Sequence, residues 1–318
     1  MAGRRQQVDD VRDGVELTSL DSELYDGAGA TKRELVDYLD AIADLLVPQL
    51  AGRPLTVMRA RGGQQPFMQK NLPKHAPQWI PTVEIWSNAS QRMVRYPFCA
   101  DRRTLLWFAN QWAVEFHPTL LIWPDRVDCL LIDLDPPEQL GFDAVITAAM
   151  VVRQVLDRWQ LPSVIKTSGS KGVHIAVPVT GVDIDDAAAA TRALAEQVAQ
   201  ADPSVATTQF LRSERGERVF VDSSRAGGAS VASVWSPRVR PGLPVSFPVA
   251  WERLSSIAPG QFTLRTALNL LPQAGPLAEA FSAPVAVPEE LIARGREIPP
   301  GRVQAMNTGK RRNRGSGS

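Results

Sequence analysis

Between residues 127 and 222, short apolar runs alternate with longer segments of helical periodicity, and this alternation constrains the fold most strongly. The runs have strand length, whereas the segments 142–159 and 184–201 repeat their apolar residues at helical spacing. Such a pattern is typical of a sheet covered by helices, so we expect an α/β or α+β core. The predicted strands are 127–134, 163–167, 173–179 and 218–222.

The flanking parts of the chain are less regular. A helix is predicted for residues 31–50, because Leu35, Leu39 and Ile42 lie on one stripe and Thr31 is a suitable N-cap. Prolines become frequent after residue 236. The other predicted segments are loops at 55–81, a strand at 82–86, a helix at 101–116 and a short helix at 263–271.

The composition is that of an ordinary globular chain. Its 318 residues include 35 Lys and Arg against 34 Asp and Glu, so overall charge does not indicate a polyanion-binding protein. Cys99 and Cys129 stand among apolar neighbours, and no run approaches the roughly 18 apolar residues of a membrane span. We therefore expect a soluble cytoplasmic protein without disulfides or a membrane partner. The basic segment 310–314 is typical of a solvated terminus, or of a salt-dependent contact with DNA phosphates.

Acidic residues end two of the predicted strands. Asp133 and Asp135 follow an apolar run, and residues two apart in a strand point to the same side. Two such charges repel each other unless a cation lies between them, which favours a divalent metal. Asp222 ends another apolar strand, and three carboxylates are enough for two metal ions. The alternatives are solvated strand ends, or the Asp-x-Asp site of haloacid-dehalogenase phosphatases, for which Pro136 fits poorly.

The segment Lys166-Thr-Ser-Gly-Ser-Lys-Gly-Val-His174 has the composition of a loop that holds phosphate. Its glycines allow tight turns, Ser168 and Ser170 offer hydroxyl donors, and Lys171 supplies a positive charge. The spacing is not that of a Walker A loop, and no helix follows. His174 begins the next strand and should lie on the side of the loop rather than in the core, although a structural histidine is the alternative.

Three segments, in this order, carry a family resemblance. Leu130-Leu-Ile-Asp-Leu-Asp-Pro136, the segment 166–174 and Arg218-Val-Phe-Val-Asp222 closely resemble motifs I, II and III of the polymerase domain of bacterial ligase D, within the archaeo-eukaryotic primase superfamily. The resemblance covers about residues 15–260. Shorter matches occur at 17–21, 31–32, 51–54, 67–71, 75–79 and 115–117.

The resemblance implies an α+β fold in which an RRM-like catalytic sheet, flanked by helices, packs beside a smaller N-terminal α/β subdomain. It places the primase-polymerase domain at 16–295, after a flexible N-terminus at 1–15 and before a basic, disordered tail at 296–318. The N-terminal subdomain would span 16–120 and the catalytic core 121–260, with an extension to residue 295. Since 318 residues leave no room for a ligase or nuclease domain, we expect a stand-alone, monomeric bacterial protein that associates with the nucleoid during repair.

The family catalyses template-dependent nucleotidyl transfer with two divalent ions, usually Mn²⁺ but also Mg²⁺, and often prefers ribonucleotides. By resemblance, Asp133, Asp135 and Asp222 are the catalytic metal ligands, and Asp222 lies near the primer 3′-hydroxyl. By resemblance, a second set of residues holds the nucleoside triphosphate. Without the resemblance, the position of His117 would indicate only the end of a helix. These predicted nucleotide ligands are His117, Ser168, Ser170, Lys171, His174 and Arg238. The predicted nucleic-acid contacts are Lys32, Phe67 and Lys70.

Some positions depart from the family pattern. Where end-joining members grip a 5′-phosphate with an Asn and two Lys, this chain has Ser19, Ser22 and Lys32. After motif III the usual Trp-Ser-Gln-Asn is replaced by Ser223-Ser-Arg-Ala226, and a downstream Val-Ala-Pro-Tyr by Ala232-Ser-Val-Trp235. We therefore expect weaker end bridging and a different selection of sugar and base.

The sequence thus predicts a nucleotidyltransferase that fills short gaps in DNA repair, acting on gapped or primer–template DNA. One alternative is an end-joining polymerase that works with a separate DNA ligase, Ku-type partners and other repair proteins. Another is a catalytically weak nucleic-acid-binding factor, against which the intact carboxylates and triphosphate loop argue.

Overall fold

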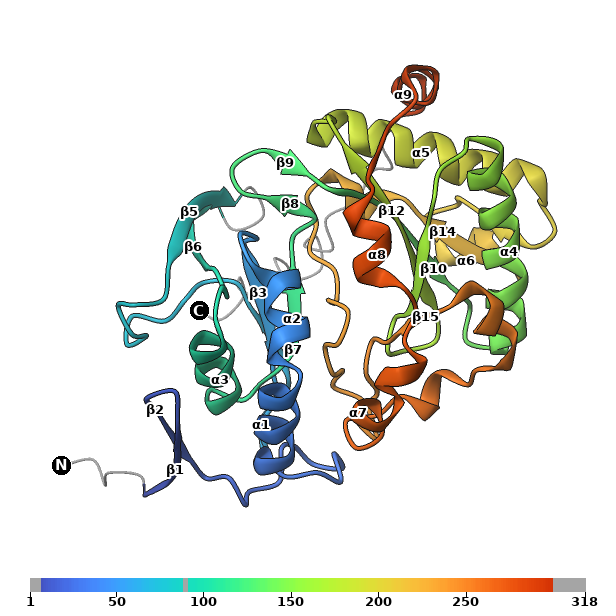
Figure 1. Ribbon diagram of the computed structural model, residues 1–318. Coiled ribbons are helices and arrows are strands. Elements are labelled where there is room, and N and C mark those ends of the chain that lie inside the picture. Colours follow the sequence, from blue (N-terminus) through green and yellow to red (C-terminus); the bar gives the residue numbers. More distant parts are fainter. Residues whose placement is uncertain (1–6, 88–90, 300–318) are drawn as a thin grey trace, which may run out of the picture.

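The computed structural model describes residues 7–87 and 91–299. In Figure 1 two groups of elements lie side by side, one formed by the chain as far as β9 (Arg126–Val127) and the other from β10 (Cys129–Asp135) onward. One apolar core runs through both groups, since it includes Leu35 and Phe116 from the first and Val177 and Phe247 from the second. We refer to the two groups as the N-terminal lobe and the catalytic lobe.

The catalytic lobe is built on one mixed sheet. Its elements after β10 are α4 (Phe142–Arg158), β11 (Val164–Thr167), β12 (Val173–Thr180), α5 (Ile184–Ala201), β13 (Ala206–Thr207), β14 (Val219–Asp222), β15 (Pro248–Val249) and β16 (Val285–Ala286). The strand order is β13-β14-β10-β12-β11-β15, and β16 pairs with β12. The run β10-α4-β11-β12-α5-β14 therefore forms a β-α-β-β-α-β unit, which confirms the predicted RRM-like sheet.

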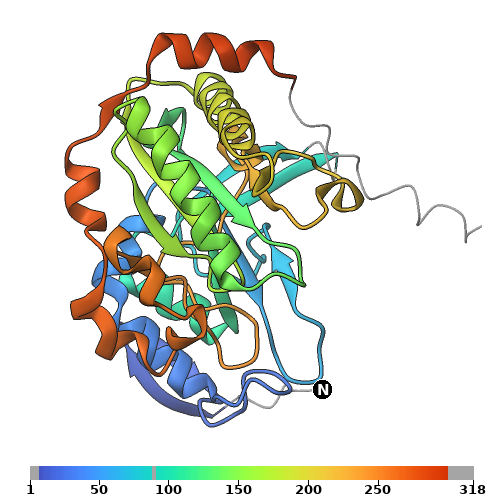
Figure 2. The ribbon, with the colours of Figure 1, turned by 90° about the vertical axis from the view of Figure 1, so that its right-hand side faces the viewer.

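Alternate residues of β10 face opposite sides of this sheet. Leu130 and Ile132 belong to the main apolar core together with residues of α4 and α5, and Figure 2 shows both helices on one side of the strands. Leu131 faces the other side, where it packs in a small apolar cluster with Leu120 of the N-terminal lobe. Because strand side chains alternate, Asp133 shares this second face and lies between the two lobes.

The N-terminal lobe combines helices with short antiparallel sheets. Its elements before β9 are β1 (Val8–Arg12), β2 (Val15–Thr18), α1 (Lys32–Ala41), α2 (Ala43–Leu50), β3 (Leu55–Arg59), β4 (Phe67–Gln69), β5 (Thr82–Ser87), β6 (Arg92–Pro97), α3 (Arg102–Asn110), β7 (Ala113–Pro118) and β8 (Leu121–Ile122). A sheet of order β4-β3-β7 forms its centre, and the pairs β1-β2, β5-β6 and β8-β9 are hairpins.

Two predicted segments of this lobe were assigned wrongly. The predicted helix 101–116 ends with α3, because Trp112 has a φ of 65° that no right-handed helix continues through, and the following residues form β7. The predicted loop 55–81 contains β3 and β4, and β3 pairs with β7. The strands β4 and β7 are short and contain polar residues, and β7 directly follows the apolar residues of α3, so the local pattern did not show where helix or loop ends and strand begins.

The predicted helix 31–50 is divided into α1 and α2 at Ile42. Its predicted N-cap is confirmed, since the Thr31 hydroxyl accepts a hydrogen bond from the Glu34 N–H (3.3 Å) and the Glu34 carboxylate accepts one from the Thr31 N–H (2.8 Å). The apolar stripe continues through the break because Ile42, Leu46 and Leu50 are all buried.

Part of the segment 1–15, predicted to be flexible, is ordered in the β1-β2 hairpin. Val15 and Leu17 are buried, and the Arg12 guanidinium pairs with Asp37 (2.7 Å) and Asp40 (3.1 Å) of α1. The hairpin is thereby attached to the lobe by apolar contacts and by charge. The composition of this segment is polar, so the stabilising contacts were visible only once α1 was placed beside it.

Short helices follow the sheet strands. They are α6 (Arg212–Arg215), η1 (Ser224–Gly227), η2 (Trp251–Ser256), η3 (Pro259–Gln261), α7 (Ala267–Leu270), η4 (Leu271–Gln273), α8 (Leu277–Ser282) and α9 (Glu289–Glu297). The predicted helix 263–271 corresponds to α7. In the described chain, no helix combines the length and apolar character that crossing a membrane requires. The basic segment 310–314 lies outside the described residues.

A glycine determines how closely α9 approaches α5. A Cβ atom built on Gly295 would lie 1.8 Å from the carbonyl oxygen of Ala189, so we expect Gly295→Ala to force the two helices apart. Overpacking of this kind costs about 1–3 kcal/mol. Thermal unfolding and hydrogen exchange of the α9 amides measure the effect, with Gly260→Ala as control because no atom lies within 4 Å of its added Cβ. Unchanged α9 protection in Gly295→Ala would contradict the close packing.

Candidate active site

Four ionisable side chains form a row across the central sheet. In the antiparallel register, Asp222 on β14 pairs with Asp133 on β10, Asp133 pairs with His174 on β12, and His174 pairs with Lys166 on β11. Residues paired across neighbouring strands share one face of the sheet, so strand pairing brings these four groups together. The motifs had assigned roles to the first three, whereas Lys166 had none.

The acidic end of this row is crowded with like charges. The pKa of Asp133 is raised to about 6, chiefly by burial and further by the carboxylates of Asp222 and Asp135, while the Arg225 guanidinium opposes the rise. Arg225 Nε lies 3.7 Å from Asp133 Oδ2 and 3.5 Å from Asp222 Oδ2. Arg215 Nη1 lies 3.5 Å from Asp135 Oδ2. Two arginines therefore neutralise part of the charge of the predicted metal ligands.

The donor chemistry of these carboxylates suits a divalent cation. Carboxylate oxygens are preferred by Mg²⁺ and Mn²⁺, and a cation between Asp133 and Asp222 would relieve the repulsion between them. Within residues 7–87 and 91–299, no three acidic, His or Cys side chains stand close enough together to hold a metal ion. In this structure each of the three carboxylates lies beside an arginine instead.

The loop between β11 and β12 is held in shape by one of its own serines. Ser168 Oγ accepts hydrogen bonds from the N–H groups of Ser170 (3.2 Å) and Gly172 (3.3 Å). Gly169 has a φ of 67°, and a Cβ on Gly172 would lie only 1.9 Å from the carbonyl oxygen of Leu134. The two glycines therefore allow a tight loop that lies directly against the end of β10.

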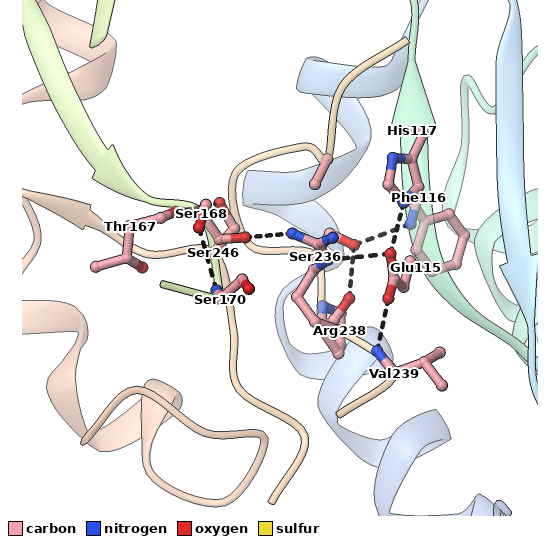
Figure 3. Close-up of polar contacts among 12 residues, drawn as sticks. Glu115, Phe116, His117, Thr167, Ser168, Ser170, Ser236, Arg238, Val239 and Ser246 are labelled. Atoms are coloured by element: carbon pink, nitrogen blue, oxygen red, sulfur yellow. Dashed lines mark hydrogen bonds and ion pairs between the residues drawn. The ribbon is translucent and has the colours of Figure 1, made fainter. Parts of the chain in front are cut away.

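Glu115 connects two of the predicted nucleotide ligands to each other, as Figure 3 shows. Its Oε2 accepts hydrogen bonds from His117 Nε2 (2.7 Å) and Arg238 Nε (3.0 Å), and its Oε1 accepts one from the Val239 N–H (2.6 Å). Arg238 also donates to the carbonyl oxygen of Ser168. This arginine therefore connects Glu115 on β7 of the N-terminal lobe to the loop 168–172 of the catalytic lobe, which we call the phosphate-type loop.

The electrostatics of Glu115 keep it ionised. Burial alone would raise its pKa, but the His117 and Arg238 contacts and the Val239 N–H outweigh burial and lower the pKa to about 2. Burial lowers the pKa of His117, although Glu115 opposes that effect. The resemblance had marked the segment 115–117 without giving Glu115 a role, and its partners Arg238 and Val239 lie far away in the sequence.

Lys166 lies at the end of the row opposite to Asp222. Its Nζ donates to Ala232 O (2.9 Å), to Ser246 Oγ (2.7 Å) and to His174 Nδ1 (2.7 Å). Burial is the main cause that lowers the Lys166 pKa to about 7. Burial, reinforced by Lys166, also lowers the pKa of His174 well below its usual value, so the imidazole is neutral and its Nε2 faces Asp133 Oδ1 at 3.5 Å.

His174 is buried without belonging to the apolar core. It is only 4% exposed, but the core contains its neighbours Val173 and Ile175, whose side chains face the other side of the sheet. His174 itself lines the same pocket as the loop. The reason is that the pocket lies between the two lobes, where a sheet residue is covered by the opposite lobe and still borders the site.

The predicted catalytic and nucleotide-binding residues meet in one open pocket. It lies between the lobes, because Met68 and His117 of the N-terminal lobe line it together with the sheet residues. Basic side chains that the motifs did not predict surround it. The predicted residues in its lining are His117, Asp133, Asp135, Ser168, Ser170, Lys171, His174, Asp222 and Arg238. The additional arginines are Arg212, Arg215, Arg225 and Arg240.

The predicted nucleic-acid contacts divide into two groups. Phe67 and Lys70 are exposed at β4 and just after it, so their roles stay predictions. Lys32 is 1% exposed, and its Nζ donates to Thr18 O (2.7 Å) and Asn110 Oδ1 (2.7 Å) beneath the Trp112 ring. In this structure the Lys32 ammonium is partnered inside the lobe, so its contact with nucleic acid stays a prediction.

A family model described as LigD, primase-polymerase domain, matches residues 31–277. The chain belongs to this LigD primase-polymerase family. Membership implies a nucleotidyltransferase, which replaces the phosphatase alternative. The carboxylates and the loop described above lie inside the matched range.

Relatives and a solved structure agree with the family assignment. The chain is 30% identical to the bifunctional non-homologous end joining protein LigD of Bacillus subtilis over 268 residues, which is 82% of the chain and 43% of that protein. It is also 30% identical to the multifunctional LigD of Mycolicibacterium smegmatis over 87% of the chain and 37% of that protein. The chain thus spans about two fifths of the length of these relatives.

The structural match covers nearly the whole of its counterpart. The polymerase domain of Mycobacterium tuberculosis ligase D, solved in complex with DNA, aligns with a TM-score of 0.78 at 28% identity. The alignment covers 85% of this chain and 99% of that domain. The α+β architecture of the LigD polymerase domain is therefore shared.

The depressed pKa of Glu115 predicts a pH dependence of folding stability. Because the folded pKa of about 2 lies below the ordinary value of 4.5, the ionised side chain stabilises the fold above pH 4.5, and this stability is lost as the pH falls toward 2. Ionised Glu115 contributes at most about 3 kcal/mol to the free energy of unfolding. Denaturant unfolding between pH 2.5 and 7 measures it.

The matched variants are Glu115→Gln and Glu217→Gln, the second at an exposed position. Glu115→Gln should lower the free energy of unfolding at neutral pH, and its deficit should shrink as the pH falls below 4.5. Glu217→Gln should follow the unmodified protein throughout. A constant deficit for Glu115→Gln at every pH would show that its charge is not what stabilises the junction between the lobes.

Proposed function

We propose that this chain is a template-dependent polymerase that extends a DNA primer by nucleotidyl transfer, fills short gaps during repair and accepts ribonucleotides. The observation that carries the proposal is the meeting of an acidic strand end with a phosphate-type loop in one pocket. Asp133, Asp135 and Asp222 line this pocket together with Ser168 and Lys171. Family membership and the DNA complex of the mycobacterial polymerase domain support the same reaction class.

The proposed mechanism depends on position and charge. Divalent ions bound at Asp133, Asp135 and Asp222 would supply charge neutralisation for the attacking and leaving oxygens. In this proposal Asp222 receives the proton of the primer 3′-hydroxyl, whose oxygen forms a bond to the α-phosphorus while the bond to pyrophosphate breaks. Lys171 and Arg238 hold the triphosphate and stabilise the charge that develops on pyrophosphate.

The two lobes have separate tasks in this proposal. The catalytic lobe carries the carboxylates and the loop. The N-terminal lobe presents Phe67 and Lys70, which are exposed at β4 and just after it, next in the chain to Met68, which lines the pocket. An exposed aromatic ring beside a basic residue suits a template base and its phosphate. The names of the relatives favour a setting in end joining, where DNA ligase and Ku-type proteins would be the partners of this chain. The residue departures at Ser19 and Ser22 favour simple gap filling instead.

Extension of gapped DNA tests the catalytic role of the carboxylates. Asp133→Asn removes one charge from the proposed metal site and should lower primer extension at least about 100-fold with either Mn²⁺ or Mg²⁺. Asp185→Asn, on the exposed side of α5, should retain activity. Both nucleotide sugars are compared in the same assay. Equal extension by Asp133→Asn and the unmodified protein would overturn the metal role, and DNA binding without incorporation by the unmodified protein would favour the binding-factor alternative.

Dependence on a downstream 5′-phosphate distinguishes gap filling from end bridging. Because Lys32 is buried and partnered, and Ser19 and Ser22 carry no charge, we expect the phosphate to change the extension rate by less than about threefold. The measurement compares gapped duplexes that differ only in that phosphate. A large stimulation by the phosphate would indicate a grip built from other residues and would favour the end-joining setting.

A further inference from the structure

Arg225 lies between the two opposed carboxylates of the active site. It belongs to η1, three residues after Asp222, so the turn that follows β14 returns its side chain to the strand end. Its Nε is 3.5 Å from Asp222 Oδ2 and 3.7 Å from Asp133 Oδ2.

The contacts of Arg225 are electrostatic rather than hydrogen-bonded. Among the described residues, its Nε is buried and has no hydrogen-bond partner. An unsatisfied buried N–H is unfavourable, so the attraction of the two carboxylates must hold the guanidinium there. Arg215 differs, because it donates to the carbonyl oxygens of Gln209 (3.1 Å) and Phe210 (2.9 Å) and is thereby anchored independently of the acidic residues.

A guanidinium at this place competes with a metal ion for the same oxygens. Asp133 and Asp222 are only 16% and 12% exposed, so two ionised carboxylates there need a positive group near them. The guanidinium of Arg225 is a positive group close to both carboxylates, and it can supply that charge when no metal is bound. A divalent ion that takes its ligands from Asp133 and Asp222 must separate them from Arg225, since two cations cannot share this space without repulsion.

We propose that Arg225 is an internal counter-ion that occupies the metal position between Asp133 and Asp222 and has to be displaced when a divalent ion binds. The proposal rests on the proposed metal role of these carboxylates. It assigns Arg225 as a residue that sets metal affinity, through Asp133 and Asp222. The displaced side chain has room to move, because it is 39% exposed toward the pocket.

Direct binding of Mn²⁺, without DNA or nucleotide, tests the proposal. Titrations followed by the electron paramagnetic resonance signal of free Mn²⁺ give the affinity of each variant independently of activity. Arg225→Gln and Arg225→Ala should each bind Mn²⁺ about tenfold more tightly than the unmodified protein, since a coupling of this kind is typically 5- to 150-fold. Arg225→Lys keeps the positive charge and should stay near the original affinity. Circular dichroism confirms that each variant is folded.

Arg240→Gln is the matched control, because Arg240 lines the same pocket but is not paired with these carboxylates. It removes the same charge from the pocket and should change Mn²⁺ affinity by less than about twofold. Affinity that is unchanged or weaker in Arg225→Gln and Arg225→Ala would overturn the proposal. An equal gain in Arg240→Gln would also overturn it, by showing a general effect of pocket charge.

Asp133→Ala, alone and combined with Arg225→Gln, separates this proposal from the proposed function. If Asp133→Ala abolishes Mn²⁺ binding while Arg225→Gln changes nothing, the metal site stands and only the counter-ion role fails. If Asp133→Ala leaves Mn²⁺ binding intact in both backgrounds, the proposed metal site itself fails. Tight binding in Arg225→Gln that disappears in the double variant supports both.

Discussion

The register of three antiparallel strand pairs is the constraint on which the site depends. Pairing of β14 with β10, of β10 with β12 and of β12 with β11 brings Asp222, Asp133, His174 and Lys166 into one row. A shift of one residue in any pair would turn part of the row toward α4 and α5, into the apolar core. The apolar alternation in β10 opposes such a shift, because Leu130 and Ile132 belong to that core.

Burial and neighbouring charges then determine the pKa values of the residues in this row. Burial disfavours ionised groups, and it moves the pKa of Asp133 up to about 6 and that of Lys166 down to about 7. Each shift is moderated by neighbours of opposite sign, so the site holds several compensating charges within one pocket. Glu115 extends this compensation to the junction of the lobes, where it fixes Arg238 between β7 and the loop that begins at Ser168. The pocket is therefore formed by both lobes and not by the sheet alone.

Much of this arrangement could be predicted from local patterns. The motifs identified the three carboxylates and the loop, and the structure places all of them in one pocket with His117 and Arg238. The α4 and α5 helices were predicted because their apolar spacing is regular over many turns. Segment 113–118 was missed because it directly follows the apolar and aromatic residues of α3, and the local residue types do not reveal the turn at Trp112 that separates helix from strand. Its pairing with β3 shows that this segment is a strand.

By itself, the sequence determined which chemical groups are present and where glycines allow a tight turn of the backbone. The strand-ending carboxylates, the glycines of the loop and the family assignment all follow from short segments whose residues are neighbours along the chain. Only the tertiary structure decided which charges meet. Lys32 is buried beneath Trp112 and bonded to Thr18, and Arg238 reaches Glu115 across 123 positions. The type of a charged residue does not show whether water or protein surrounds its side chain. Its partner, its pKa and its function therefore depend on the residues that the fold brings next to it.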